Sequence, residues 1–145
     1  MLMKLLGRSK VEAFIDSNVI LRYLCGDIEA KKLLDAVEVG FINPVVVSEV
    51  LYGYIRLATG LKPYELKEKF HEIVDLDLNP AFESLSDFIL LPLPLKLEEV
   101  KELIEKYRLL PNDALITLTC KHYRIGKIIS FDKDFKRIDF LETLP

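Results

Sequence analysis

The chain has 145 residues, half of them apolar and 30% charged, and its formal net charge at pH 7 is −3. This composition predicts one globular domain over residues 1–145, with a hydrophobic core and no long disordered region. The negative net charge argues against a generic binder of polyanions, which is usually basic. A local basic face remains open, because six basic residues crowd one stretch near the C-terminus: Lys121, Arg124, Lys127, Lys133, Lys136 and Arg137.

The cysteines and the apolar segments bear on the cellular compartment. Cys25 and Cys120 lie far apart, outside any C-x-x-C pair or Cys/His cluster, so they indicate neither a disulfide framework nor a zinc site. We expect two buried, reduced thiols. Residues 1–10 carry too short an apolar patch for a signal peptide, and the proline-interrupted Phe88–Leu95 is far shorter than the ~20 residues of a membrane helix. A soluble, cytoplasmic protein without membrane association is expected.

The spacing of apolar residues predicts strands alternating with helices in the first part of the chain. The predicted elements are a strand at Val11–Ile15, a helix at Ser17–Gly26 capped by Ser17, a helix at Ile28–Val39 ended by Gly40, a strand at Phe41–Ile42, and a helix from Pro44 to about Thr59. Asn43 is expected to cap this last helix, with proline at its first position. Its start stays open, because the β-branched Val45–Val47 favour an extended strand.

The second part of the chain is harder to interpret between Asp75 and Leu95, where Asn79-Pro80 is expected to break the chain. The predicted elements are a helix from Pro63 to about Val74, a short helix after Phe82, an edge strand near Ile89–Leu93, a helix at Leu97–Tyr107, a helix from Pro111 to about Tyr123 ended by Gly126, a strand at Lys127–Phe131 and an edge strand at Phe140–Leu144. The alternation predicts an α/β fold with a mostly parallel sheet covered on both sides.

Three acidic residues are isolated in strongly apolar segments. Each is the only acid within a long interval: Asp16 between Glu12 and Asp27, Glu49 between Glu38 and Glu65, and Asp113 between Glu105 and Asp132. Asp16 and Asp132 both follow predicted strands, and open parallel sheets bind ligands outside the carboxyl ends of their strands. A carboxylate near a core is costly to ionise unless something compensates its charge, and a divalent cation such as Mg²⁺ or Mn²⁺ is one such compensation. If the acids converge, their repulsion raises their pKa values.

Each acid also has a purely structural explanation. Asp16 can cap the following helix, Asp113 can favour the positive end of a helix dipole, and Asp132 can be an ordinary turn residue. Glu49 lies several residues inside its helix and caps nothing, which favours a functional explanation there. The combination of the four, rather than any one of them, indicates a cation site.

Four motifs extend over nearly the whole chain: a strand followed by D-[TS]-N in Phe14–Leu21, a helix glutamate in Ser48-Glu49, a D-A-L-I helix start in Asn112–Ile116, and a closing [TS]-x-D-x-D-F in Ile129–Phe135. In type and in order they resemble the motifs of the PIN-domain nuclease family, and in particular of its VapC-type toxin ribonucleases. The long, proline-broken segment 75–95 departs from the pattern and leaves the dimer surface and substrate groove undefined.

The resemblance implies a three-layer α/β/α sandwich, Mg²⁺ or Mn²⁺ as cofactor, hydrolysis of RNA phosphodiester bonds, a homodimer and an antitoxin partner. Asp16, Glu49 and Asp113 would be the main metal-binding and catalytic acids, and the fourth would be Asp132, with Asp134 as its competitor. The resemblance gives supporting roles to Ser17, Asn18 and Ser130. Metal-assisted hydrolysis of this kind needs no histidine.

Three alternatives remain beside this hypothesis. A phosphatase of the haloacid-dehalogenase type expects D-x-D after the first strand, where this chain has Asn18 in the third place. A receiver-like binding and signalling module expects paired acids there, and Asp16-Ser17-Asn18 lacks the pair. A catalytically silent PIN scaffold would bind RNA or a protein partner without cutting, and the presence of all four acids argues against it.

Overall fold

The computed structural model describes residues 11–145, so the expectation about a signal peptide in residues 1–10 lies outside it. Its centre is a sheet of five strands in the order β3-β2-β1-β4-β5, and every pair is parallel. The strands are β1 (Val11–Ile15), β2 (Val37–Ile42), β3 (Ile89–Leu90), β4 (Lys127–Ile129) and β5 (Glu142–Leu144). The expected α/β fold is confirmed, with β3 and β5 at the two edges as predicted.

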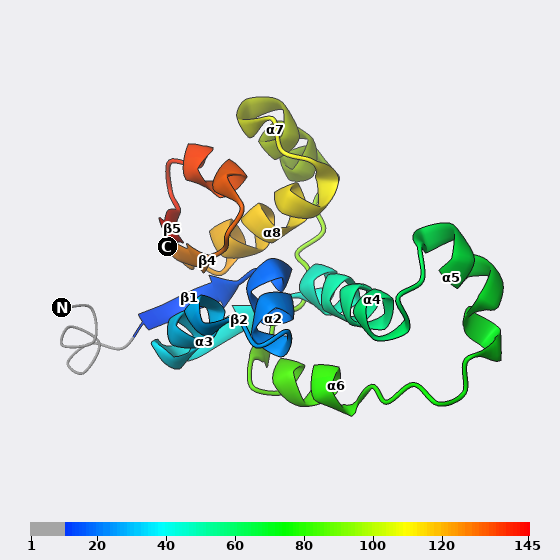
Figure 1. Cartoon of the computed structure of the whole chain (residues 1–145). Coiled ribbons are helices and arrows are strands. Elements are labelled where there is room, and N and C mark those ends of the chain that lie inside the picture. The colour runs from blue at the N-terminus through cyan, green and yellow to red at the C-terminus, as the bar shows by residue number, and fades with distance from the viewer. Residues whose placement is uncertain (1–10) are drawn as a thin grey trace.

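Helices connect these strands and cover the sheet (Figure 1). They are α2 (Ser17–Leu24), α3 (Ile28–Asp35), α4 (Pro44–Thr59), α5 (Pro63–Lys69), α6 (Asn79–Leu85), α7 (Leu97–Tyr107) and α8 (Pro111–His122), with short 3-10 helices η1 (Phe70–Glu72) and η2 (Lys133–Arg137). Within residues 11–145, no helix is both long enough and apolar enough to cross a membrane.

The order of the strands explains the three layers. The chain moves from β1 through β2 to β3, and then returns to place β4 and β5 on the other side of β1. Because crossovers between parallel strands are right-handed, the two directions of travel put their helices on opposite faces, with α7 and α8 on the second face. Strand order reverses between β1 and β4, and the carboxyl ends of strands at such a reversal form the usual ligand site of this architecture.

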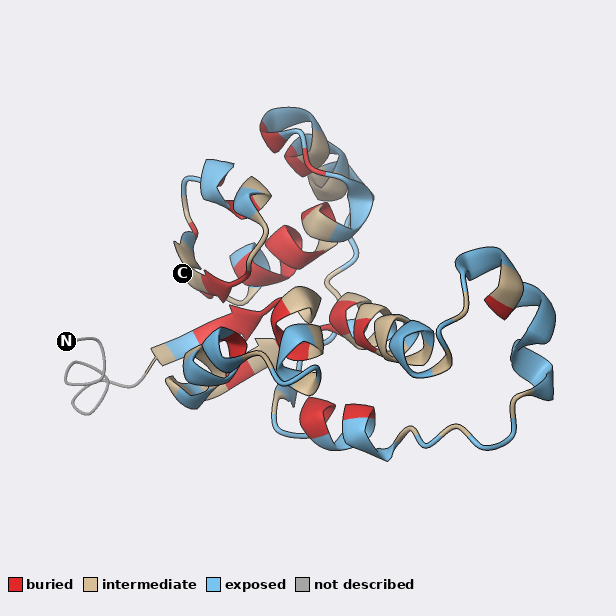
Figure 2. Cartoon of the chain, in the orientation of Figure 1, coloured by how far each residue is buried: buried red, intermediate tan, exposed pale blue. Residues whose placement is uncertain are grey.

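The core lies around β1 and α8 (Figure 2). Ala13, Phe14 and Ile15 are fully buried, as expected for a central strand with helices on both faces. Helix α8 buries a continuous run from Ile116 to Cys120, although two of these five residues are threonines. Their hydroxyls are satisfied by the helix itself, since each donates to the carbonyl oxygen four residues earlier.

Two helix starts depend on local caps. Asn43 caps α4 as predicted: its Oδ1 accepts from the Val46 amide at 3.1 Å, and its buried Nδ2 donates to the Thr119 hydroxyl at 2.9 Å. The predicted cap of α2 was wrong by one residue, because Asp16 caps the helix and accepts from the Ser17 amide. Ser17 is the first helical residue, which frees its hydroxyl for another partner.

The predicted helix at Ile28–Val39 was too long. Helix α3 ends at Asp35, and β2 begins at Val37, two residues later. Gly40 therefore lies inside a strand, where it pairs with Ala13 of β1, and does not end a helix. The apolar spacing suited a helix as far as Val37, but pairing along the buried central strand stabilises the extended form more.

The boundaries between α5 and β5 also differ from prediction. Asn79-Pro80 begins α6 instead of breaking the chain, because proline is tolerated in the first turn and the Asp77 carboxylate accepts from the Asn79 amide at 2.9 Å. The helix predicted to reach Val74 ends at Lys69 and continues as η1. Helix α8 ends at His122, and the left-handed Arg124, rather than Gly126, makes the turn that follows.

Candidate active site

Five acidic side chains from four parts of the chain lie at the carboxyl edge of the sheet, close enough that the charges of the other four raise the pKa of Asp113. Asp16 directly follows β1, Glu49 lies in the second turn of α4, Asp113 lies in the first turn of α8, and Asp132 and Asp134 lie at the start of η2. We call these five residues the acid site. They include all four acids predicted as catalytic, together with the competitor Asp134.

Asp16 is the most buried member, with 4% of its surface exposed. Its Oδ1 accepts from the Ser17 amide at 2.8 Å, and its Oδ2 accepts from the Ser130 hydroxyl at 2.7 Å and from Asn18 Nδ2 at 3.3 Å. Three donors therefore fix the carboxylate in one orientation at the end of β1.

Ser130 and Asn18 connect Asp16 to the loop after β4. The Ser130 hydroxyl accepts from the Asp132 amide at 2.9 Å while it donates to Asp16. Asn18 Oδ1 accepts from the Phe131 amide at 3.2 Å. The loop that carries Asp132 is thus tied to the helix that follows Asp16.

Glu49 faces the same side of the molecule as Asp113. Its Oε1 accepts from the Ser17 hydroxyl at 3.0 Å, and its Oε2 accepts from Asn112 Nδ2 at 3.0 Å. Asn112 is the neighbour of Asp113, so α4 and the start of α8 meet at this carboxylate. A shared ion would be impossible if Glu49 and Asp113 lay on opposite sides of the molecule. They lie on the same side, so the structure is compatible with one.

Asp113, Asp132 and Asp134 form the tightest group. Within residues 11–145, one carboxylate oxygen from each lies within 4.8 Å of the other two, and all three residues are partly buried. Oxygen donors at this spacing, partly open to solvent, suit a hard divalent cation that keeps some of its waters. Asp132 and Asp134 both lie in this group, so proximity to Asp113 does not separate them.

The electrostatics reflect this crowding. Burial raises the pKa of Asp16 to about 6, against the hydrogen bonds from Ser130 and Ser17, and the charges of Glu49 and Asp132 raise it further. The pKa of Asp113 is raised to about 7, first by burial and then by the charges of Asp132, Asp16, Glu49 and Asp134. Repulsion among the acids is therefore present in the metal-free chain, and a bound cation would relieve it.

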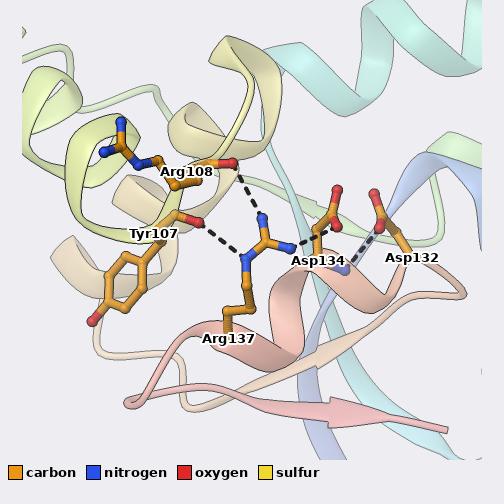
Figure 3. A network of polar contacts seen from close by, with 5 residues as sticks. All are labelled: Tyr107, Arg108, Asp132, Asp134 and Arg137. Atoms are coloured by element: carbon orange, nitrogen blue, oxygen red, sulfur yellow. Dashed lines mark hydrogen bonds and ion pairs between the residues drawn. The ribbon is translucent and has the colours of Figure 1, made fainter.

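Arg137 distinguishes Asp134 from Asp132 (Figure 3). Its Nη1 donates to Asp134 Oδ1 at 2.9 Å, and the rest of the guanidinium donates to the carbonyl oxygens of Tyr107 and Arg108, both at 3.1 Å. Asp132 instead accepts from the Asp134 amide and caps η2. The charge of Asp134 is thus partly balanced by a cation of the chain, whereas no such ion pair involves Asp132 in the described part.

Two residues of this network were not predicted. Asn112 stands in the motif that contains Asp113, and its position beside a solitary acid was the available signal. Arg137 follows Asp134 by three residues, a spacing that brings side chains together on a helical turn. The sequence offered no sign that it also reaches the carboxyl end of α7.

The sequence matches the model of a known protein family. The family model described as PIN domain matches residues 13–141. The chain belongs to the PIN-domain family. The predicted resemblance is confirmed, and the receiver and haloacid-dehalogenase alternatives are set aside.

Known proteins, including one named as a ribonuclease and one as a toxin–antitoxin complex, resemble the chain along nearly its full length. A Methanocaldococcus jannaschii protein named Ribonuclease VapC2 is 48% identical, over 98% of this chain and 99% of that protein. VapBC2 from Rickettsia felis, solved with a DNA fragment from its promoter, has a TM-score of 0.64 at 18% identity, covering 93% of this chain and 100% of the other. A toxin–antitoxin complex from Klebsiella pneumoniae has a TM-score of 0.55 at 22% identity, with 90% and 96% covered. The two solved structures share the three-layer fold of this chain.

Proposed function

We propose that this PIN-domain chain is a metal-dependent endoribonuclease that hydrolyses RNA phosphodiester bonds and is the toxin of a toxin–antitoxin pair. The observation that carries the proposal is the grouping of Asp113, Asp132 and Asp134, with carboxylate oxygens within 4.8 Å of one another. The relative named Ribonuclease VapC2, 48% identical, supports the choice of RNA as substrate.

The residues fit Mg²⁺ or Mn²⁺, because the site offers only oxygen donors and carries excess negative charge. Asp16, Glu49, Asp113 and Asp132 would hold the cation, with Asp134 as a further candidate. When bound, the cation would polarise the scissile phosphate and lower the pKa of an attacking water. The chain's part is to hold its carboxylates converging on one point, where a bound cation would favour their ionised form.

The polar neighbours of the acids would keep them in position. Ser17 holds Glu49, while Asn18 and Ser130 hold Asp16 and the Asp132 loop. Groups that orient metal ligands typically change metal affinity or activity by about 10- to 100-fold when they are removed. Ser130→Ala is therefore expected to weaken activation by Mn²⁺ without unfolding the chain.

The proposal extends to partners and assembly. We propose an antitoxin protein as partner, supported by the likeness in fold to the Klebsiella pneumoniae complex. We also propose a homodimer as the working form. Light scattering of the purified chain would give the mass in solution. A monomeric mass at micromolar concentration would contradict the homodimer.

Cleavage of RNA tests the proposal directly. Single-stranded and structured RNAs are incubated with the chain in Mg²⁺, Mn²⁺ or EDTA, beside Asp16→Asn and Asp113→Asn variants purified in the same way. Cleavage is expected with either metal and not with EDTA, and both variants should fall to the level of the buffer. Equal cleavage by wild type and variants would reveal a contaminating nuclease, and a folded wild type that never cuts would favour the catalytically silent scaffold.

A further inference from the structure

A hollow of about 520 Å³ opens beside the acid site, between α2 and α4. It is lined by Ser17 and Leu21 of α2 and by Glu49, Tyr52, Gly53 and Arg56 of α4, among others. Ser17 and Glu49 are joined by the 3.0 Å hydrogen bond already described, so the hollow begins at the acid site itself. A polymer cut at the acid site must continue along the surface on both sides of the cut, and this hollow is directly available to it.

The shape of the hollow depends on Gly53. A Cβ atom at this position would lie 2.6 Å from Leu21 Cδ1, so the missing side chain allows α2 and α4 to pack closely. The hollow is therefore lined by the half-buried Leu21 and Gly53 and by the exposed Tyr52 and Arg56.

A second hollow of about 420 Å³ lies between α4 and the α5–η1 region, where it touches α4 at Tyr52 and Ile55. Tyr52 lines both hollows, and the second also includes Lys67 and Phe70 from the α5–η1 region. In Figure 1 this region lies beyond α4, on the side away from the sheet. The two hollows meet at Tyr52, and the second lies on the side of α4 that faces α5.

The exposed groups that line the two hollows include two aromatic rings and two cations. Tyr52 and Phe70 are 47% and 42% exposed, so their faces are open to a ligand. Arg56 and Lys67 are exposed, and none of the ion pairs in the described part of the chain involves either of them. Single-stranded nucleic acids are bound by such combinations, because rings stack on bases while cations contact phosphates.

We propose that the surface formed by these two hollows, the α4 groove (Tyr52, Arg56, Lys67 and Phe70), holds the nucleotides of single-stranded RNA that adjoin the scissile phosphate. Tyr52 and Phe70 stack on unpaired bases, and Arg56 and Lys67 contact the phosphates between them. The inference rests on the proposed ribonuclease function and adds where its substrate lies. RNA is the occupant that the position favours, because the first hollow opens at the acid site, where the cut strand must pass, and exposed rings beside cations suit unpaired bases and phosphates.

Binding of RNA without cleavage is the direct test. The probe is a fluorescein-labelled, unstructured 12-nucleotide RNA, titrated with full-length Asp113→Asn chain and followed by fluorescence anisotropy. In that background, Tyr52→Ala and Arg56→Ala are each expected to weaken binding by about tenfold, as for loss of one stacking or phosphate contact. Tyr52→Phe keeps the ring and should stay within about twofold. Arg56→Ala should also lower the dependence of affinity on salt by about one ion.

Matched controls come from α5. Tyr64→Ala and Lys69→Ala remove an exposed ring and an exposed cation that do not line either hollow, and both should bind as the parent does. A duplex of the same sequence should show no dependence on Tyr52, because its bases are not free to stack. Circular dichroism confirms that each variant is folded, and wild type in EDTA repeats the titration without the Asn substitution.

The outcomes separate this inference from the proposed function. The inference is overturned if the Tyr52 and Arg56 variants bind RNA as tightly as the Asp113→Asn chain. It is also overturned if neither the Asp113→Asn chain nor wild type in EDTA binds RNA, even when wild type cleaves. Absence of cleavage by folded wild type would instead remove the proposed function. If Tyr52→Ala loses a co-purifying protein while its RNA affinity is unchanged, the groove is a protein-docking surface and the inference is overturned.

Discussion

Asp16 shows how one residue carries a structural and a chemical property together. It caps α2 through its bond with the Ser17 amide, and it is also the most buried acid at the carboxyl edge of the sheet. The sequence presented these as competing explanations, but the geometry allows both, because the two carboxylate oxygens have different partners. A cap of this kind places a charge where the strand ends, which is also where ligands bind.

The raised pKa values predict how stability depends on pH in the metal-free chain. Asp16 and Asp113 have pKa values of about 6 and about 7, above the ordinary 3.8, so the folded state binds protons more tightly than the unfolded state. Their contribution to the free energy of unfolding is fully present below pH 3.8, the ordinary pKa, and is lost as pH rises through their folded-state pKa values of about 6 and 7. In EDTA, Tm should therefore fall between pH 5 and pH 8.

Asp113→Asn should flatten this fall and raise Tm at pH 8, because it removes one of the repelling charges. Asp75→Asn, at an exposed position before α6, serves as the control and should follow wild type. Mn²⁺ should raise Tm of wild type more at pH 8 than at pH 6, since the cation competes with protons for the carboxylates. A Tm in EDTA that rises steadily from pH 5 to pH 8 would contradict the assigned shifts.

Arg137 offers a second prediction at the residue scale. Arg137→Met removes three hydrogen bonds, two of them to carbonyls at the end of α7 and one to Asp134. We expect a loss of about 1–2 kcal/mol in the free energy of unfolding, because the ion pair is half-exposed and the carbonyls regain water. Lys136→Met, an exposed change in the same 3-10 helix, should stay within about 0.5 kcal/mol. Urea unfolding measures the free energy of unfolding of both variants. Equal stability of the two would show that the hydrogen bonds of Arg137 do not stabilise the fold.

At the scale of elements, the stretch from α3 to β2 was assigned wrongly because a local pattern competed with a distant partner. Leu33, Leu34 and Val37 have helical spacing, and the strand around Gly40 is revealed only by its pairing with β1. Asn79-Pro80 was misassigned for a local reason, because proline is tolerated in the first turn of a helix and this pair begins α6. The elements that were predicted with the right bounds, such as Leu97–Tyr107, have strong periodicity of their own.

Gly40 gives a prediction for this element. A Cβ atom there would lie 2.6 Å from Cδ1 of Phe88 and 3.1 Å from Ile15, within the closely packed layer between β2 and the start of β3. Gly40→Ala is therefore expected to cost about 1–3 kcal/mol through overpacking. Gly126→Ala is the matched control, because no atom beyond its chain neighbours lies within 4 Å of the position that the alanine Cβ would take, and it should be close to neutral. Thermal unfolding compares the two, and an unchanged Tm for Gly40→Ala would mean that Phe88 moves aside freely.

At the scale of the whole molecule, the reversal of strand order determines where distant residues meet. Asp16 follows β1 and Asp132 follows β4, neighbours in the sheet that are more than a hundred residues apart in the chain. Helix α8 runs beside them through the core, and it brings Asp113 to the same edge. A fold of this kind can assemble a cation site from acids that have no local relation to one another.

The two thiols report on the integrity of the whole molecule. The expectation that both are buried was wrong for Cys25, which caps the end of α2 and is exposed, and right for Cys120 in the core face of α8. Burial also raises the pKa of the Cys120 thiol, which further suppresses its reaction. A thiol reagent should therefore label one cysteine quickly in the native chain and the second only after unfolding. Rapid labelling of two cysteines in the native Cys25-containing chain, or of one in Cys25→Ser, would contradict this packing.

The sequence by itself determined the class of fold, most of the helices and the identity of the solitary acids. These features are local: periodicity, the Asn43-Pro44 start of α4 and the lack of other acids around Glu49 are each contained in a few consecutive residues. The roles of the acids remain predictions until cleavage and metal binding are measured.

Only the tertiary structure decided the limits of β2, the hold of Arg137 on Asp134, the bridge from Ser17 through Glu49 to Asn112, and the α4 groove. Each depends on which distant segments come into contact, and no pattern along the chain encodes a distance between side chains. The physical reason is that packing and strand pairing act across the fold, whereas propensity and capping act within a turn.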